Sequence, residues 1–186
     1  MDKFLNLKEN KMEKIIVIFI FLISSCSISD NLHGQDQNEK FTIYLIRHSE
    51  KDLKFSDQSD PPLSKCGLKR SKNLKKFFKN KNLDVIYTTD FDRTRSTAAW
   101  ISNSKDNEIV YYNADDLEKL SKLLIAKKQN ALVVGHSNTT GVLSGLLAGQ
   151  SIGSYSSDIY NRIYRVVIYN DNKFLDLIES NFVCLQ

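Results

Sequence analysis

The chain alternates between two hydrophobic patterns, and this alternation limits its fold more than any other feature. Short apolar runs that suit buried strands occur at residues 41–46, 83–87, 108–112 and 131–134. Amphipathic patterns of helical period follow them at residues 64–79, 93–102, 116–128 and 139–147. Strands that alternate with helices build crossover units. The pattern therefore predicts an α/β fold, a three-layer α/β/α sandwich around a mainly parallel central sheet.

The end of the chain departs from this alternation. The stretch "IYRVVIYNDNKFLDLI", residues 163–178, holds two β-type runs joined by the turn residues "NDNK". A hairpin of this kind predicts an antiparallel strand at one edge of the sheet. The sequence shows no internal repeat and no second domain.

The amino-terminal part carries the features of an export signal. Lys11 and Lys14 precede an unbroken apolar run at residues 15–23, which is shorter than the roughly 20 residues of a membrane span. The following Ile23-Ser24-Ser25-Cys26 resembles a bacterial lipobox, in which the cysteine is lipidated. We therefore expect a signal peptide with lipobox over residues 1–26, with a plain secretory signal or an uncleaved anchor as alternatives.

This reading sets the expected domain organisation and location. Residues 27–40 have no periodicity and are interpreted as a flexible tether, and residues 41–186 form the folded domain. We expect an exported bacterial lipoprotein, anchored to the membrane on the periplasmic or cell-surface side. Cys66 and Cys184 stand 118 residues apart, a separation that says nothing about their distance, and we expect free thiols.

Basic residues gather in one segment, although the formal net charge is only +4. Residues 64–81, "SKCGLKRSKNLKKFFKNK", hold eight Lys or Arg and no acidic residue. The segment is interpreted as the solvated face of an amphipathic helix, and the alternative is a surface for anionic lipid or an anionic substrate. Its aromatic residues lie on the apolar face and do not alternate with basic ones, so we expect no nucleic-acid binding.

Cationic and titratable side chains follow three of the predicted strands. Arg47 and His48 follow the first strand, Arg93 begins the helix after the second, and His136 follows the fourth, with Ser137 and Asn138 next to it. In a parallel sheet, ligands bind at the carboxyl ends of the strands. We therefore expect these residues to meet at one edge of the sheet.

Arginine at these positions points to an oxyanion. The chain has 26 Lys plus Arg, of which only six are Arg. Lysine is thus its usual basic residue, and arginine after two of the strands is an exception. The planar guanidinium holds an oxyanion through two parallel hydrogen bonds, which lysine does not reproduce. The simplest ligand is a phosphate. A metal bound by the histidines is the rival, but neighbouring arginines would repel a cation and no zinc-type spacing is present. We expect no metal and no cofactor.

Together these motifs resemble the histidine phosphatase superfamily, in its phosphoglycerate-mutase-like branch 1. The Arg-His-Gly signature is matched by Arg47-His48-Ser49, the later arginine motif by "TTDFDRTRSTAA" with Arg93, and the Gly-His motif by Gly135-His136. "DPPLSKCGLKRS" is similar to the family's Leu-Thr-x-x-Gly stretch. The short length resembles the phosphohistidine phosphatases of the family.

The resemblance implies a mechanism. His48 would attack phosphorus and form a transient phosphohistidine, which water then hydrolyses. Arg47, Arg93 and His136 would surround the phosphoryl oxygens, with His136 as a charged donor. Ser49 stands where the family has glycine and would add a substrate-binding donor, alongside Ser137 and Asn138. No metal takes part in this mechanism.

The general acid is the open point of the resemblance. Mutase-like members place a glutamate after the third strand, and here Asp115 and Asp116 occupy that region. Asp115 is either the acid or only a helix cap. Glu50 is a further candidate, unless it pairs with Lys51.

The expected function is hydrolysis of phosphomonoesters without a metal, at an exported, membrane-anchored site. The expected substrate is a phosphorylated small molecule or a phosphoprotein. Scavenging of phosphate at the cell surface would differ in substrate only. The alternative function is a non-catalytic phosphate- or phosphopeptide-binding lipoprotein. We expect a monomer whose contact with the membrane is its lipid anchor.

Overall fold

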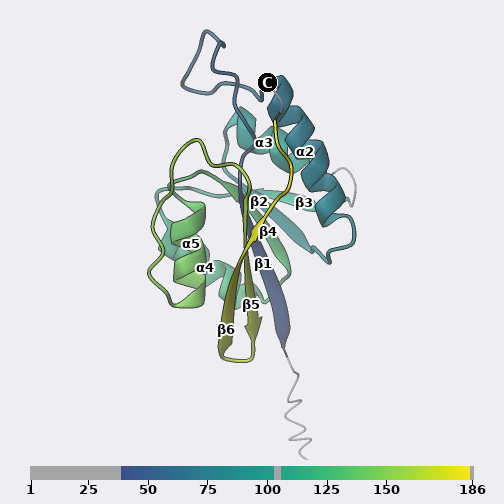
Figure 1. The fold of residues 1–186 in the computed structure, drawn as a ribbon. Helices are drawn as coiled ribbons and strands as arrows, with labels where there is room; N and C mark the ends of the chain where they lie inside the picture. The colour runs from purple at the N-terminus through teal and green to yellow at the C-terminus, as the bar shows by residue number, and fades with distance from the viewer. Residues whose placement is uncertain (1–38, 103–105, 185–186) are drawn as a thin grey trace, which may run out of the picture. The chain divides into compact units, whose positions relative to one another are not determined.

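A computed structural model describes residues 39–102 and 106–184 (Figure 1). The signal peptide, its lipidation site Cys26 and nearly all of the predicted tether lie outside the described residues. Six strands form one sheet in the order β3-β2-β4-β1-β5-β6. Their bounds are β1 Lys40–Arg47, β2 Val85–Thr88, β3 Glu108–Tyr111, β4 Ala131–Gly135, β5 Arg162–Tyr169 and β6 Asn172–Glu179.

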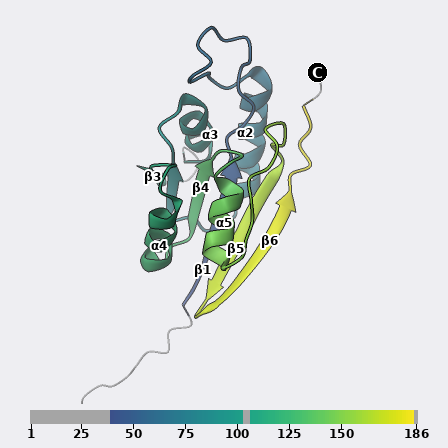
Figure 2. The same ribbon diagram turned by 90° about the vertical axis from the view of Figure 1, so that its left-hand side faces the viewer.

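Two pairs of helices cover the two faces of this sheet. Their bounds are α2 Lys65–Phe78, α3 Asp92–Ser102, α4 Leu117–Lys127 and α5 Thr140–Ala148. In Figure 1, α4 and α5 lie on the left side of the sheet and α2 on the right, and Figure 2 shows β6 at one edge. The predicted three-layer α/β/α sandwich is confirmed.

The apolar residues divide into two cores, one on each face of the sheet. One core joins Leu120 and Leu124 of α4 and Leu143 and Leu147 of α5 to the strands. The other joins the sheet to α2 and α3 through Leu74, Phe78, Ala98 and Ile101. Both faces of β1 and β4 are covered, which is why these strands are almost entirely apolar. The charged side chains of these strands, Lys40 and Arg47, therefore lie at the two ends of β1.

The strand register places the site residues side by side. β1 pairs in parallel with β4, so that Arg47 lies opposite Gly135, and the His48 amide donates to the Gly135 carbonyl at 2.9 Å. On the other side of β4, Thr88 of β2 lies opposite Val134. Three strands thus end at one level, and the residues after them meet as the sequence predicts.

The carboxyl-terminal hairpin is confirmed, and its placement refines the prediction. β5 pairs antiparallel with both β1 and β6, so the strand that opposes the parallel set is second from the edge. β6 is the edge strand, and it runs in the same direction as β1. None of the helices among the described residues is long and apolar enough to cross a bilayer.

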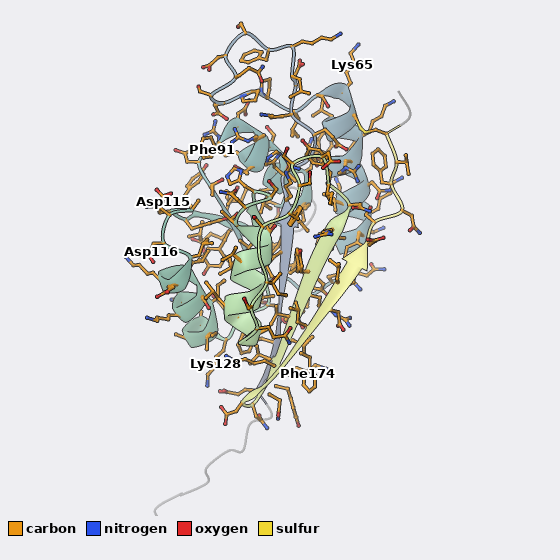
Figure 3. All side chains as sticks on the ribbon, turned by 60° about the vertical axis from the view of Figure 1, so that its left-hand side comes forward. Lys65, Phe91, Asp115, Asp116, Lys128 and Phe174 are labelled. Carbon is orange, nitrogen blue, oxygen red and sulfur yellow. A yellow bond between two sulfur atoms is a disulfide. The ribbon has the colours of Figure 1, made fainter. Side chains whose placement is uncertain are left out.

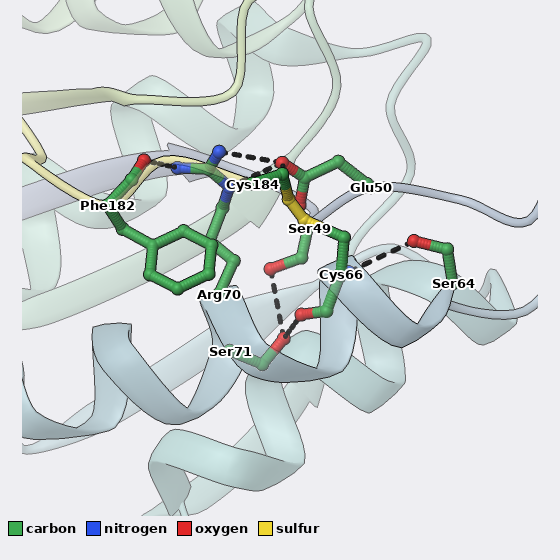
Figure 4. The surroundings of a disulfide bond; sticks show 9 residues. Ser49, Glu50, Ser64, Cys66, Arg70, Ser71, Phe182 and Cys184 are labelled. Carbon is green, nitrogen blue, oxygen red and sulfur yellow. Dashed lines mark hydrogen bonds and ion pairs between the residues drawn. A yellow bond between two sulfur atoms is a disulfide. The ribbon is translucent and has the colours of Figure 1, made fainter. Parts of the chain in front are cut away.

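The expectation of free thiols is wrong. Cys66 at the start of α2 and Cys184 in the carboxyl-terminal segment form a disulfide, with their Cα atoms 5.9 Å apart (Figure 4). The sequence separation of 118 hid this proximity, because the fold brings together two segments that are distant in the chain. The disulfide ties the end of the chain to the first turn of α2.

Side chains cap the starts of two helices. The side chain of Ser64 accepts a hydrogen bond from the Gly67 amide and caps α2. The cap of α4 is Asp116, whose side chain accepts from the Lys119 amide at 3.0 Å. Asp115 is therefore not the cap, because the helix begins one residue later than a cap at Asp115 requires.

Candidate active site

A cavity of about 380 Å³ opens where β1, β2 and β4 end. Its lining residues come from the strand ends and from the loop before α4: Arg47, His48, Lys51, Phe91, Arg93, Ala114, Asp115, His136, Ser137, Asn138 and Thr139. Phe91 and Asp115 are labelled in Figure 3. Three cationic side chains and a single carboxylate line the cavity, a balance that suits an anionic ligand.

His48 is held as a neutral imidazole. Only 3% of its surface is exposed, and its Nδ1 lies 2.7 Å from the carbonyl oxygen of Ser49. A carbonyl only accepts, so Nδ1 carries the ring proton and Nε2 keeps its lone pair. Burial lowers the pKa of His48 to about 2, and the nearby Arg47 and His136 also act to lower it. A neutral ring with a bare Nε2 is the form that a nucleophile requires.

Arg47 is clamped by a loop from the far end of the chain. Its Nη1 donates to the carbonyls of Ser157 at 2.7 Å and Ile159 at 3.1 Å, and its Nη2 donates to the Tyr160 hydroxyl at 3.3 Å. The guanidinium carbon also lies 3.9 Å from the centroid of the Tyr160 ring. Both Nη1 protons are therefore used within the protein.

The opposite edge of Arg47 has free donors. Its Nε is buried and has no hydrogen-bond partner. One Nη2 proton is also left over, because the hydroxyl of Tyr160 takes only one. Nε and Nη2 form the edge of a guanidinium that binds an oxyanion with two parallel hydrogen bonds. An unpaired buried donor costs stability, so a ligand at this edge would relieve that cost.

Arg93 reaches the cavity from the first turn of α3. Its Nη1 donates to Asp60 Oδ1 at 3.2 Å, and its guanidinium carbon lies 4.3 Å from the centroid of the Phe91 ring. The Asp60 carboxylate also accepts from the Asp92 amide at 2.8 Å. Asp60 thus fixes both the arginine and the start of the helix that carries it.

His136 lies beside His48 at the end of β4. The two ring centroids are 5.4 Å apart, and the Phe91 ring lies 5.3 Å from the His136 ring. Burial, together with the nearby charges of Arg93 and Arg47, lowers the pKa of His136 to about 4. In the ligand-free cavity His136 is therefore neutral, unlike the charged donor that the family resemblance implies.

Two further candidates lie behind the loop that carries His48, away from the cavity (Figure 4). Ser49 has no exposed surface, and its hydroxyl accepts from Ser71 Oγ at 2.9 Å. Glu50 forms an ion pair with Arg70 at 2.6 Å and not with Lys51. Neither side chain lines the cavity. Among the residues that the structure describes, the carboxylate that lines the cavity is that of Asp115. Ser137 and Asn138 also line it, as the sequence predicts.

Three contributors were not foreseen in the sequence: the Tyr160 loop that holds Arg47, Asp60, which holds Arg93, and Thr89, whose hydroxyl lies 3.0 Å from His136 Nε2. Thr89 stands inside the "TTDFDR" motif, so its position after a strand was a usable signal. Asp60 begins the "DPPLSKCGLKRS" stretch, so its place in a motif was also a usable signal. For Tyr160 the sequence holds no comparable signal, because it acts through a loop.

The fold resembles solved phosphatase structures. The protein histidine phosphatase SixA complexed with tungstate aligns with a TM-score of 0.61 at 16% identity, over 75% of this chain and 97% of that one. The alpha-ribazole phosphatase from Shigella flexneri aligns with a TM-score of 0.59 at 14% identity, over 78% and 100%. At such low identity these alignments establish the fold alone.

The sequence comparisons give a match to a protein family and one curated relative. Residues 43–121 match the histidine phosphatase superfamily (branch 1). Phosphoserine phosphatase 1 of Hydrogenobacter thermophilus is 27% identical over 120 residues, which cover 62% of this chain and 47% of that protein. The chain thus spans about half the length of this curated relative. The matched residues include Arg47, His48 and Arg93 and end before His136. The chain is therefore similar to the branch 1 histidine phosphatases in its fold and in these motifs.

Proposed function

We propose that this protein is a metal-independent phosphomonoester hydrolase that acts through a phosphohistidine intermediate on His48. One observation carries the proposal: a buried, neutral histidine with a bare Nε2 lines the same cavity as an arginine that has unpaired donors. A nucleophile and an oxyanion binder at one cavity are what phosphoryl transfer to a side chain requires. Binding alone would not need the bare imidazole nitrogen.

Substrate binding would use the side chains that already line the cavity. The Nε and Nη2 edge of Arg47 would take two phosphoryl oxygens, and Arg93 would hold a third while still in contact with Asp60. The backbone and Tyr160 contacts keep the Arg47 edge in place before the substrate arrives. This preorganisation stabilises the charge that develops on the phosphoryl oxygens in the transition state.

The chemistry would proceed in two steps. In the first, His48 Nε2 forms a bond to phosphorus as the bond to the ester oxygen breaks, and the Asp115 carboxyl protonates the departing oxygen. In the second, a water oxygen bonds to phosphorus as the nitrogen–phosphorus bond breaks, and the water proton returns to Asp115. Phosphate leaves, and His48 regains its bare Nε2. Asp115 is assigned this role because no other carboxylate from the described part of the chain lines the cavity.

The substrate would be a small phosphomonoester or a phosphorylated side chain that enters the cavity. Lys51 adds a positive charge to the lining beyond the two arginines, which favours a substrate with an acidic group next to its phosphate. The curated relative is named for phosphoserine, a phosphomonoester that carries a carboxylate. Phosphoserine is therefore the first substrate to test, followed by phosphopeptides.

We also propose that the protein is an exported lipoprotein anchored through Cys26. The lipobox-like residues 23–26 support this, and so does the Cys66–Cys184 disulfide, because disulfides persist mainly in oxidising compartments. The test is incorporation of a labelled fatty acid by cells that express the full chain. The label should appear in the parent and disappear in Cys26→Ser, and equal labelling of both would contradict the proposal.

Hydrolysis of an aryl phosphate tests the catalytic proposal. Turnover would be measured from pH 4 to pH 8 with a chelator present, for the parent and for His48→Ala. The proposal predicts chelator-resistant turnover in the parent and its loss in the variant. If the parent binds phosphate but hydrolyses no substrate at any pH, the protein is a phosphate-binding lipoprotein and the catalytic proposal fails.

A further inference from the structure

His136 is linked to a pair of buried threonine hydroxyls that the proposed mechanism does not use. His136 Nε2 lies 3.0 Å from Thr89 Oγ1, and Thr89 Oγ1 lies 3.0 Å from Thr94 Oγ1. Thr89 is 2% exposed and Thr94 is fully buried. Water therefore does not supply hydrogen-bond partners for these hydroxyls, and their protons must be placed among the protein atoms.

The proton of Thr94 has a defined acceptor. Its Oγ1 lies 2.8 Å from the carbonyl oxygens of both Thr89 and Phe91. Carbonyl oxygens only accept, so the single hydroxyl proton of Thr94 is donated to one of them. The lone pairs of Thr94 Oγ1 then accept from Thr89 Oγ1 and from the Phe91 amide at 3.3 Å.

The direction of the next bond follows. Because Thr94 has no proton left to donate, the 3.0 Å contact between the two hydroxyl oxygens is a hydrogen bond only if Thr89 donates. The proton of Thr89 is then used, and its oxygen is left as an acceptor. Its remaining neighbour is His136 Nε2, which must therefore carry a proton and donate it.

We propose that Thr89 and Thr94 are positioning residues that hold the proton of neutral His136 on Nε2, so that Nδ1 must gain a proton when a phosphoryl group binds. This inference rests on the proposed function, since it concerns the same phosphate site. Nδ1 has no hydrogen-bond partner among the residues that the structure describes. It is therefore the ring nitrogen that is free to meet a ligand in the cavity.

The charges around His136 explain why this proton arrives with the ligand and not before it. The charged or titratable groups at this end of the cavity are Arg47 and His48 after β1, Arg93 on α3, Lys51, and Asp115 before α4. Burial and the two arginines disfavour a second proton on the empty ring. A dianionic ligand supplies negative charge at contact distance and reverses this balance. The proton leaves a solvent or buffer molecule and forms an N–H bond at Nδ1, and no bond between heavy atoms changes.

The consequence is that phosphate binding and proton uptake are coupled. A bare Nδ1 would repel a phosphoryl oxygen, whereas a protonated Nδ1 donates a charge-assisted hydrogen bond to it. If the ring proton of neutral His136 could move to Nδ1, His136 would donate from Nδ1 and no further proton would be taken up. The two threonines thus decide whether His136 meets the phosphoryl group as a cation.

Calorimetry of tungstate binding tests the coupling, with tungstate as a dianionic phosphate mimic. Binding at pH 7 in two buffers of different ionisation enthalpy gives the number of protons taken up. We expect about one proton per tungstate in the parent, and therefore an affinity that falls about tenfold per pH unit as the pH rises. His48→Ala should still take up this proton, because the acceptor is His136.

Variants of Thr89 provide the sharpest comparison. Thr89→Val removes the hydroxyl at nearly constant volume and should bind tungstate with much less proton uptake, whereas Thr89→Ser keeps the hydroxyl and should behave as the parent. Equal uptake in Thr89→Val and the parent would overturn the inference. Tungstate binding by the parent without uptake would also overturn it, whereas no binding at all would refute the proposed phosphate site instead.

Nitrogen NMR of the histidine rings tests the tautomer without any ligand. In the ligand-free parent at pH 7, we expect His136 to be protonated on Nε2 and bare on Nδ1. Thr89→Val and Thr94→Val should both lose this preference, and Thr89→Ser should retain it. A proton on Nδ1 in the parent, or an unchanged tautomer in both valine variants, would contradict the role of the threonine pair.

Discussion

The two sides of the loop that follows β1 differ in what their residues do. On the cavity side, His48 and Arg47 offer unpaired nitrogen atoms to a ligand. On the far side, Glu50 forms an ion pair with Arg70, and the Cys66–Cys184 disulfide lies next to Glu50 (Figure 4). On the cavity side, nitrogen atoms remain without hydrogen-bond partners. On the far side, most polar groups have partners within the protein. Changes on the cavity side should therefore alter activity, and changes on the far side should alter stability as well.

The largest effect on the cavity side is expected for Arg47→Lys. Lysine keeps the charge but loses the two-donor edge and the contacts with the loop at Ser157 and Ile159. We expect kcat/KM for an aryl phosphate to fall by about 100- to 1000-fold, with little change in the urea midpoint. The control is Arg165→Lys, which alters an exposed ion pair with Asp176 and should leave turnover unchanged. Equal losses in both variants would remove the special role of Arg47.

On the far side, opening the disulfide should give the largest effect on stability. Cys66 and Cys184 close a loop of 118 residues, and loss of such a crosslink costs about 3 kcal/mol. Urea unfolding of Cys66→Ser, Cys184→Ser and the double variant should show the same loss in all three. Adding a reductant to the parent should match them. An unchanged midpoint after reduction would show that the far side does not depend on this bond.

Asp115→Asn separates the two steps of the proposed chemistry. The amide cannot protonate a leaving oxygen, so hydrolysis of an alkyl phosphate should slow by about 100-fold or more. An aryl phosphate with an acidic leaving group needs little protonation, so its kcat/KM, which reports the first step, should be affected much less than that of the alkyl phosphate. Asp116→Asn, at the α4 cap, is the matched control and should slow neither substrate. Equal slowing of both substrates in Asp115→Asn would rule out the acid role.

Gly67→Ala tests whether the far side holds the catalytic loop in place. A Cβ at Gly67 would lie 2.2 Å from the backbone oxygen of Glu50, so the loop or α2 must shift. We expect a loss of about 2 kcal/mol in the free energy of unfolding, together with a several-fold lower kcat. At Gly153 nothing lies within 4 Å of the added atom, so Gly153→Ala should change neither quantity. A Gly67→Ala variant that loses stability but keeps full activity would contradict the link between packing and activity.

The smallest effect concerns pH. His48 has a pKa of about 2 in the folded protein against 6.5 as its ordinary value, so below about pH 6.5 the unfolded chain binds the proton first. Its contribution to stability is therefore constant above that pH and falls by about 1.4 kcal/mol per pH unit below it. The urea midpoints of the parent and of His48→Asn should converge as the pH falls from 7 to 5. Parallel curves would show that His48 is not held neutral by burial.

The sequence predicted the elements and the strand ends well, because both depend on local patterns. All four early strands and all four helices lie within two residues of their predicted bounds. Arg47, His48, Arg93 and His136 meet in one cavity because parallel strands end at a common level. For β5, the local pattern gave the hairpin but not its place beside β1, since pairing partners are not encoded by periodicity.

What the sequence did not predict depends on loops that meet only in three dimensions. The carbonyl clamp on Arg47 comes from residues more than 100 positions later, and the contact of Asp60 with Arg93 joins a loop to the first turn of α3. Neither contact follows a period. The neutral state of His136 without a ligand was also not predicted, because it depends on burial and on the two nearby arginines.

The most direct test of the account is to trap the phosphoenzyme. The protein would be mixed with a phosphomonoester labelled on its phosphate, quenched in alkali within milliseconds, and the labelled residue located by mass spectrometry of its peptides. The account predicts phosphate on His48 that is stable in alkali and released by acid, and none in His48→Ala. Turnover without any label, or a label on another residue that persists in His48→Ala, would contradict it.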